Sequence, residues 1–133
     1  MDPFLKYFGS MEAIDKKRSL KLSHNLYVIE LSKKIWTDSW KFRKANPHYM
    51  GVAGCLYVGI TSHSPQERFK KHKTGYRNKK GIKISSSIVE KYGLYLRPSL
   101  YAELNPMTRM RATKMEGRLA ESLRKRGYAV WWN

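Results

Sequence analysis

The sequence is poor in cysteine and in acidic residues, and it lacks a long apolar run. Its single cysteine, Cys55, cannot form a disulfide within the chain, and no Cys/His spacing matches a zinc site. Because Cys55 lies in an apolar segment, we expect a small buried hydrophobic residue there. No apolar stretch approaches the roughly 20 residues of a membrane-spanning helix, and no secretory signal is present. We therefore expect an intracellular protein without a membrane span, cytoplasmic or associated with the nucleoid.

Basic residues greatly outnumber the acidic ones. The chain contains 27 Lys and Arg against 10 Asp and Glu, so its formal net charge is +17 at pH 7. Such a charge opposes compaction and favours a polyanionic partner, for which nucleic acid is the leading candidate. An anionic membrane surface is less favoured, because no basic amphipathic helix with bulky apolar anchors stands apart from the core pattern.

Local patterns predict three strands and three helices. Runs of β-branched and aromatic residues are typical of strands, and Gly and Pro mark the ends of helices. The predicted strands cover 26–31, 56–60 and 128–132, and the predicted helices cover 65 to about 73, 86–92, and a longest segment from a cap at Asn105-Pro106 to about 126.

The order of these elements predicts one α+β domain at residues 25–133. The chain length of 133 residues allows one hydrophobic core. We expect a small three-stranded mixed or antiparallel sheet flanked by helices. Residues 1–24 predict a helical and basic N-terminal extension, and residues 32–54 form a long insert between the first two strands.

Residues 55–75 are the most informative segment of the chain. An apolar run ends in glycine, and after a short loop a helix opens at a capping box that starts with Ser64. Within this helix Arg68 and His72 are four residues apart, so both project from one face. A guanidinium can hold a phosphate through two hydrogen bonds, and an imidazole can accept a proton or orient a phenol.

Two tyrosines and one glutamate complete the set of candidate residues. Tyr27 and Tyr57 occupy equivalent places in the first two predicted strands. A tyrosine can deprotonate water only if nearby cations lower its pKa from about 10. Glu116 lies beside Leu119 and Leu123 on the inward side of the longest predicted helix, where a carboxylate needs a partner. Mg²⁺ is one such partner, because carboxylates and phosphate oxygens together often hold it.

Each of these residues also has a purely structural interpretation. Glu116 can form a salt bridge with one of the 27 cations. Arg68 can be a solvated helix cation, His72 a structural histidine, and the two tyrosines ordinary core residues. Each pattern is weak alone, and the order in which the residues follow one another is more specific.

That order begins with Asn25-Leu26-Tyr27 and continues with Tyr57-Val58-Gly59, Arg68, His72, Glu116 and the last residue, Asn133. It resembles the GIY-YIG nuclease family over roughly residues 25–133, and the block from Tyr57 to His72 is its specific part. The family fold is a small antiparallel sheet flanked by helices. This chain departs from the family in Asn25, which stands where the first motif has glycine, and in the length of the insert.

The resemblance implies hydrolysis of phosphodiester bonds in DNA with one Mg²⁺ or Mn²⁺ ion per site, leaving 5′-phosphate and 3′-hydroxyl ends. Glu116 would bind the metal, and Arg68 would stabilise the transition state. Tyr27 would orient or deprotonate the attacking water with help from His72, and Tyr57 would complete the pocket. RNA as a substrate stays open, as do the monomer and the homodimer. The implied site is Tyr27, Tyr57, Arg68, His72 and Glu116, with Gly59 and Asn133 as supporting residues.

A basic segment follows directly on this site. Residues 68–83 hold eight Lys or Arg and no acid, which indicates a surface for the nucleic-acid backbone. A solvated charged loop is the alternative. The predicted contacts are Lys70, Lys71, Lys73, Tyr76, Arg77, Lys79, Lys80 and Lys83.

Three functions compete for this sequence. A metal-dependent endonuclease is the preferred one. A catalytically inactive nucleic-acid-binding module of the same fold is the second, and the departures from the family pattern favour it. A polyanion-binding interaction protein without nucleic-acid chemistry is the third.

Overall fold

The computed structural model describes residues 4, 9, 21–75, 77, 80 and 86–133. Most of the predicted N-terminal extension lies outside these residues, as do Tyr76, Lys79 and Lys83 of the predicted basic segment. The described chain has an α+β fold in which helices flank one mixed sheet, as the order of the predicted elements indicates.

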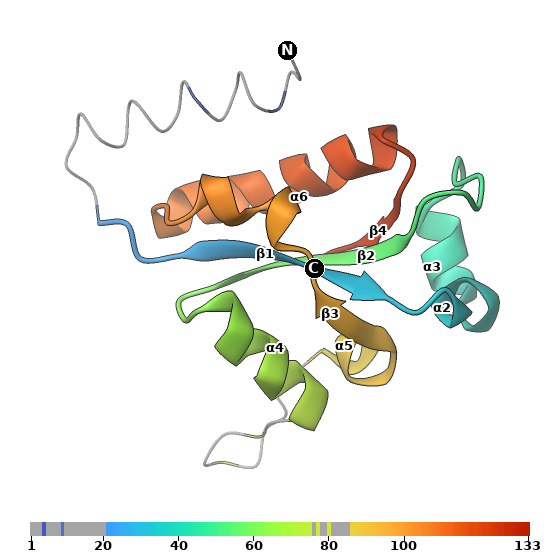
Figure 1. Ribbon diagram of the computed structural model, residues 1–133, viewed down its shortest axis with the longest axis horizontal. Coiled ribbons are helices and arrows are strands. Elements are labelled where there is room, and N and C mark those ends of the chain that lie inside the picture. The colour runs from blue at the N-terminus through green and yellow to red at the C-terminus, as the bar shows by residue number, and fades with distance from the viewer. Residues whose placement is uncertain (1–3, 5–8, 10–20, 76, 78–79, 81–85) are drawn as a thin grey trace.

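The sheet has four strands in the order β3-β1-β2-β4 (Figure 1). β1 lies in the centre and pairs antiparallel with β2 and β3, whereas β2 pairs parallel with β4. β3 and β4 are therefore the two edge strands. The strands are β1 (Asn25–Leu31), β2 (Cys55–Thr61), β3 (Gly93–Leu96) and β4 (Ala129–Trp131).

The fourth strand corrects the expectation of three, because the sequence gives no sign of β3. This strand has only four residues, begins directly after a helix, and leaves Leu94 and Tyr95 about half exposed. It is held by pairing with β1, where Tyr95 lies beside Glu30. So short an edge strand has no alternation of apolar and polar residues long enough to recognise.

Helices cover both faces of the sheet and one of its ends. α6 lies along one face, α4 and α5 lie along the other, and α2 and α3 lie at the end where β1 leads into the insert (Figure 1). The helices are α2 (Lys34–Asp38), α3 (Trp40–Ala45), α4 (Pro65–Thr74), α5 (Ser87–Tyr92) and α6 (Arg109–Lys125), with 3₁₀ turns at Pro98–Leu100 and Ala102–Leu104.

The start of the longest helix differs from the prediction. α6 begins at Arg109, with the Thr108 hydroxyl accepting a hydrogen bond from the Arg111 backbone N–H at 3.0 Å. Asn105 is not its cap. The Asn105 side chain instead accepts from the backbone N–H of Leu26 at 2.8 Å and donates to the Leu26 carbonyl at 2.7 Å. Asn105 thus holds the loop before α6 against β1.

The core lies on both faces of the sheet, and its largest helical contribution comes from α6. The predicted apolar stripe of α6 faces it, and Cys55 is a buried free thiol, as expected. Among the described residues, no helix combines the length and the apolar character needed to cross a membrane. The buried stripe consists of Ala112, Met115, Leu119 and Leu123.

Candidate active site

Tyr27 and Tyr57 lie on the same face of the sheet. Tyr27 of β1 is paired with Gly59 of β2, and Tyr57 precedes Gly59 by two residues. Because side chains alternate between faces along a strand, Tyr57 and Tyr27 point to the same side. Their ring centroids are 6.2 Å apart, and both tyrosines are almost fully buried.

Gly59 makes room for the phenol of Tyr27. A Cβ atom at position 59 would collide with the hydroxyl oxygen and Cζ of Tyr27. The ring cannot easily give way, because Tyr27 is 1% exposed. The glycine after Tyr57-Val58 therefore has a steric reason that is independent of any resemblance.

α4 carries the two further groups that face the tyrosines. Its N-cap is Ser64, whose hydroxyl accepts from the Glu67 backbone N–H at 3.1 Å, and it ends at Gly75 with φ 63°. The predicted capping and stop residues are thus confirmed. Arg68 and His72 lie one turn apart on this helix and are directed to the sheet.

Two hydrogen bonds fix the ring of His72. The backbone N–H of Ser86 donates to Nδ1 at 2.7 Å, so this nitrogen is an acceptor without a proton. The proton of the neutral ring is therefore on Nε2, which lies 2.8 Å from the Tyr27 hydroxyl and donates to it. Burial, together with the charge of Arg68, lowers the pKa of His72 to about 4. His72 is thus a neutral donor that orients the phenol.

The environment of Tyr27 acts on its ionisation in two directions. Burial raises the pKa of Tyr27 well above its ordinary value, and the neighbouring Tyr57 adds to the increase. The charge of Arg68 and a hydrogen bond from its guanidinium lower the pKa, by less. The excess of cations in the sequence therefore does not by itself produce a tyrosine that is ionised near neutral pH.

The carboxylate of Glu116 comes to the same place from the other face of the sheet. Glu116 is half-buried on α6, and it raises the pKa of both Tyr27 and Tyr57 through its charge. Burial raises the pKa of Glu116 itself to about 7. Within the described part of the chain, Glu116 has neither a hydrogen bond nor an ion pair through its side chain. The salt bridge considered as an alternative is therefore not formed among these residues.

The last residue of the chain also reaches the site. The Asn133 side-chain amide donates to the Tyr57 hydroxyl at 3.1 Å. The preceding Trp132 is held in place, because the Arg124 guanidinium lies 4.6 Å from its ring centroid. Burial raises the pKa of Tyr57, while hydrogen bonding to Ser86 and Tyr27 lowers it. Asn133 thus has a defined hydrogen-bond partner in Tyr57.

Ser86 is the site residue that sequence reasoning missed. It is the N-cap of α5, its side chain accepts from the Val89 backbone N–H at 3.3 Å, and its own N–H holds His72. The local sequence shows a serine before a helix, which accounts for the cap alone. Its second contact depends on how α5 packs against α4, and no sequence pattern reports that packing.

Asn25, the first residue of β1, makes a structural contact through its side chain. Its side-chain amide donates to the carbonyl of His63 at 3.0 Å. This bond ties the start of β1 to the loop that precedes α4. Asn25 therefore adds a contact between β1 and this loop, two residues before Tyr27.

The described lysines and arginine of the predicted basic segment differ in their exposure and in their contacts. Lys70, Arg77 and Lys80 are exposed. Lys73 is exposed as well, but its ammonium donates to the carbonyls of Glu90 at 3.1 Å and Gly93 at 2.9 Å. These bonds join α4 to the end of α5, so Lys73 serves the fold. Lys71 is half-buried.

No protein-family model, curated protein or solved structure matches this chain. The assignment of a function therefore depends on the residues and geometry described above.

Proposed function

We propose that the chain is a metal-dependent endonuclease of the GIY-YIG type that hydrolyses phosphodiester bonds in DNA. The observation that carries the proposal is the desolvated carboxylate of Glu116, which has no bonding partner among the described residues of a protein with net charge +17. Burying such a group without a partner is costly. Its charge reaches Tyr27 and Tyr57, and Arg68 acts on the same two tyrosines, so the groups that a phosphodiester site requires surround this pair.

The donor set fits a single hard divalent cation. The described residues contain no group of three or more His, Cys, Asp or Glu that could hold a metal ion among themselves. Mg²⁺ commonly keeps several waters and uses one or two carboxylates with substrate phosphate oxygens. Glu116 would hold Mg²⁺ or Mn²⁺ in this manner. The bound ion would supply positive charge against the scissile phosphate and the leaving oxygen.

The protein groups divide the remaining work. Arg68 stabilises the negative charge that grows on the phosphate in the transition state. His72 and Arg68 both donate to the Tyr27 oxygen, which favours the phenolate form and offsets part of the burial. Tyr27 thereby orients the attacking water and accepts its proton when positive charge is bound nearby. Asn133 and Ser86 hold Tyr57 in place beside Tyr27.

The role of Tyr27 can be tested by removing one oxygen. In Tyr27→Phe we expect cleavage to be lost while binding to DNA persists, because the ring still fills the core and the basic surface is untouched. Full cleavage by this variant would show that the water is activated elsewhere.

The experiment that tests the function is cleavage of supercoiled plasmid and of labelled single-stranded, duplex and branched DNA. We expect cutting with Mg²⁺ or Mn²⁺, none with EDTA, and none in Glu116→Gln. Glu103→Gln is the matched control, because Glu103 is an exposed glutamate outside the site and its variant removes the same charge. Labelled ends after cleavage should carry 5′-phosphate and 3′-hydroxyl groups.

The inactive nucleic-acid-binding module is the second candidate, favoured by the pKa of Tyr27, which burial raises. If the wild-type protein and Glu116→Gln bind DNA equally and neither cuts any substrate with either metal, the enzyme proposal is wrong and the binding module replaces it.

A further inference from the structure

Trp40 stands out on the surface of the insert. Its side chain is 59% exposed at the start of α3. Trp36, four residues earlier, is packed against Tyr49 with ring centroids 4.8 Å apart, and against Phe42 at 6.3 Å. The same insert thus partly buries one indole and presents the other to solvent. An exposed tryptophan contributes little to the fold, and its large flat ring offers a stacking surface to a partner.

Cations surround this indole. The Lys44 ammonium lies 5.4 Å from the centroid of the Trp40 ring, one helical turn further along. Lys41 is exposed next to it. Residues 32–54 contain five Lys or Arg and a single acid, Asp38, whose carboxylate accepts a hydrogen bond from the Tyr92 hydroxyl at 2.8 Å. The charge of this face favours an anionic partner.

α3 is rigidly joined to the edge strand that leads into the site. Asn46 at its C-terminal end accepts from the Val130 backbone N–H at 2.7 Å and donates to the Val130 carbonyl at 3.2 Å. The Arg124 guanidinium also donates to Asn46, at 3.0 Å. Val130 belongs to β4, and the chain continues from there to Asn133. The Asn133 side chain is in turn hydrogen-bonded to the Tyr57 hydroxyl. The position of Trp40 is therefore fixed relative to the candidate site.

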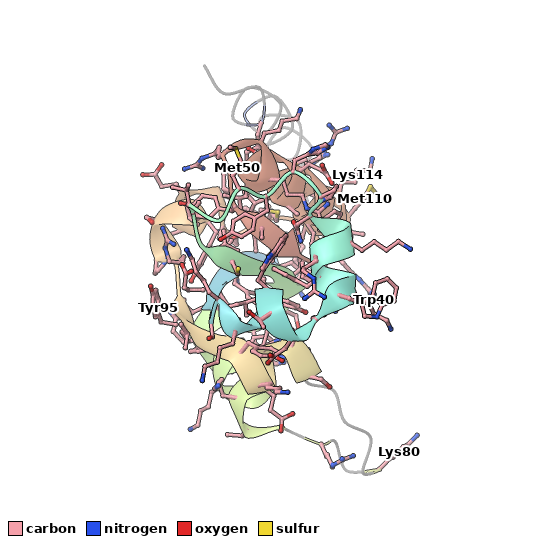
Figure 2. All side chains as sticks on the ribbon, turned by 90° about the vertical axis from the view of Figure 1, so that its right-hand side faces the viewer. Trp40, Met50, Lys80, Tyr95, Met110 and Lys114 are labelled. Atoms are coloured by element: carbon pink, nitrogen blue, oxygen red, sulfur yellow. The ribbon has the colours of Figure 1, made fainter. Side chains whose placement is uncertain are left out.

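Trp40 lies on the β4 side of the molecule. Figure 2 shows Trp40, Met110 and Lys114 toward one side and Tyr95 on the opposite side. Tyr95 belongs to β3, which is the other edge of the sheet. Since α3 packs against β4, the exposed indole lies toward the β4 edge of the sheet, away from β3.

We propose that the face formed by Trp40, Lys41 and Lys44 binds an unpaired segment of the nucleic-acid substrate, with a base stacked on the Trp40 indole. This inference rests on the proposed function, because it takes the substrate to be a nucleic acid. The substrate class that it names is DNA with a single-stranded part, such as a flap or branch. An aromatic ring stacks on any base, and lysines beside it hold the backbone. Bases inside an intact duplex are already stacked and closed to the indole.

The test is binding in EDTA, so that cleavage plays no part. Labelled single-stranded DNA, blunt duplex and a duplex with a single-stranded arm are titrated with wild type, Trp40→Ala and Trp40→Phe. Tyr95→Ala is the matched control, because Tyr95 is a similarly exposed aromatic at 53% on the opposite edge. Circular dichroism and melting confirm that each variant is folded.

We expect Trp40→Ala to weaken binding to the single-stranded and armed DNA by about tenfold or more. Binding to the blunt duplex should change by less than about twofold, because the phosphate contacts remain. The affinity of Trp40→Phe for single-stranded DNA should lie between those of Trp40→Ala and wild type. The affinity of Tyr95→Ala should equal that of wild type. Unchanged binding of single-stranded DNA by Trp40→Ala overturns the proposal, as does an equal loss for all three DNAs.

Failure of this inference and failure of the nuclease proposal give different results. Selective loss of single-strand binding in Trp40→Ala, with no metal-dependent cleavage by wild type, supports the stacking face on a binding module. Cleavage by wild type, together with unchanged single-strand binding in Trp40→Ala, leaves the nuclease and removes the stacking face.

Discussion

The hydroxyl oxygen of Tyr27 lies 2.8 Å from Nε2 of His72, although 45 residues separate the two in the chain. Ser86 determines the direction of this bond, because its N–H occupies Nδ1. The imidazole therefore gives a hydrogen bond to the phenol and does not accept the phenolic proton. A histidine that looks like a general base in the sequence is in this arrangement a positioning residue.

The ionisation of His72 follows from the same contacts. Burial and Arg68 lower its pKa to about 4, so His72 should stay neutral, with the proton on Nε2, from pH 8 down to pH 5. In the unfolded chain the imidazole takes up a second proton near pH 6.5, whereas in the folded protein it does so only near pH 4. His72 therefore makes the protein less stable as the pH falls from 6.5 toward 4. NMR of the ring nitrogens checks both the tautomer and the pKa. A titration near pH 6.5 would contradict the buried, hydrogen-bonded ring.

Replacing Gly59 with alanine should displace Tyr27. The new Cβ meets a phenol that is buried and bonded to His72, so the ring must shift and that bond is lost. We expect a loss of about 1–3 kcal/mol in unfolding free energy and loss of cleavage. Gly117→Ala is the matched control on α6, because the nearest atom to its Cβ is Nε1 of Trp132 at 3.5 Å. It should keep activity and gain up to about 1 kcal/mol. Equal melting temperatures for both variants would contradict the steric argument.

Local sequence was enough to predict β1, β2, β4, α4 and α5 to within a few residues. Each of these elements is specified by neighbouring residues, as at Ser64 and Gly75, which begin and end α4. The candidate residues could also be named from the sequence, because the sequence alone identifies which side chains carry a phenol, a guanidinium, an imidazole or a carboxylate. Their convergence on one place is a property of the sheet register and of helix packing.

What could not be predicted depends on contacts that are distant in the chain. Asn105 before a proline is a typical helix cap, yet its side chain is bonded to Leu26, 79 residues away. β3 forms because β1 offers it a partner, and Ser86 reaches His72 because α5 packs on α4. The direction of the hydrogen bond to Tyr27 follows from that last contact and is equally hidden in the sequence.

Lys70 and Lys73 should behave differently although both belong to the basic segment. Lys70 is exposed, and Lys70→Ala should reduce the slope of log K against log salt for DNA binding by about 1, with stability unchanged. Lys73 donates to Glu90 and Gly93, so Lys73→Ala should lower the melting temperature and leave the slope closer to that of wild type. Equal slopes in both variants, with equal stability, would contradict this division.

The carboxylate of Glu116 should lower stability at neutral pH. Its pKa rises from 4.5 to about 7, so between these values the folded protein keeps a proton that the unfolded chain has released. Stability from this group is therefore highest below pH 4.5 and falls as the pH rises to 7. At pH 8, Glu116→Gln should be more stable than wild type by about 1–2 kcal/mol after allowance for partial exposure, with no gain at pH 4. Urea unfolding at the two pH values measures the difference.

The same carboxylate provides a test of metal binding that does not depend on cleavage. Mg²⁺ or Mn²⁺ binds the ionised carboxylate, so either ion should raise the melting temperature of wild type more at pH 8 than at pH 6. Glu116→Gln should show no such increase, whereas Glu103→Gln should respond as wild type. A metal response that persists in Glu116→Gln would place the ion elsewhere.

Asn133 should matter for activity more than for folding. Its side chain is exposed apart from the bond to the Tyr57 hydroxyl, and Trp132 is held separately by Arg124. Asn133→Ala removes one donor and leaves the phenol free to rotate its hydroxyl, which corresponds to about 1 kcal/mol of hydrogen bonding. We expect kcat to fall by about fivefold at an unchanged melting temperature, because 1.4 kcal/mol is a factor of ten. Asn133→Gln keeps the amide on a longer side chain and should recover part of the rate. A loss of rate that comes with an equal loss of stability would instead make Asn133 an anchor of the chain end.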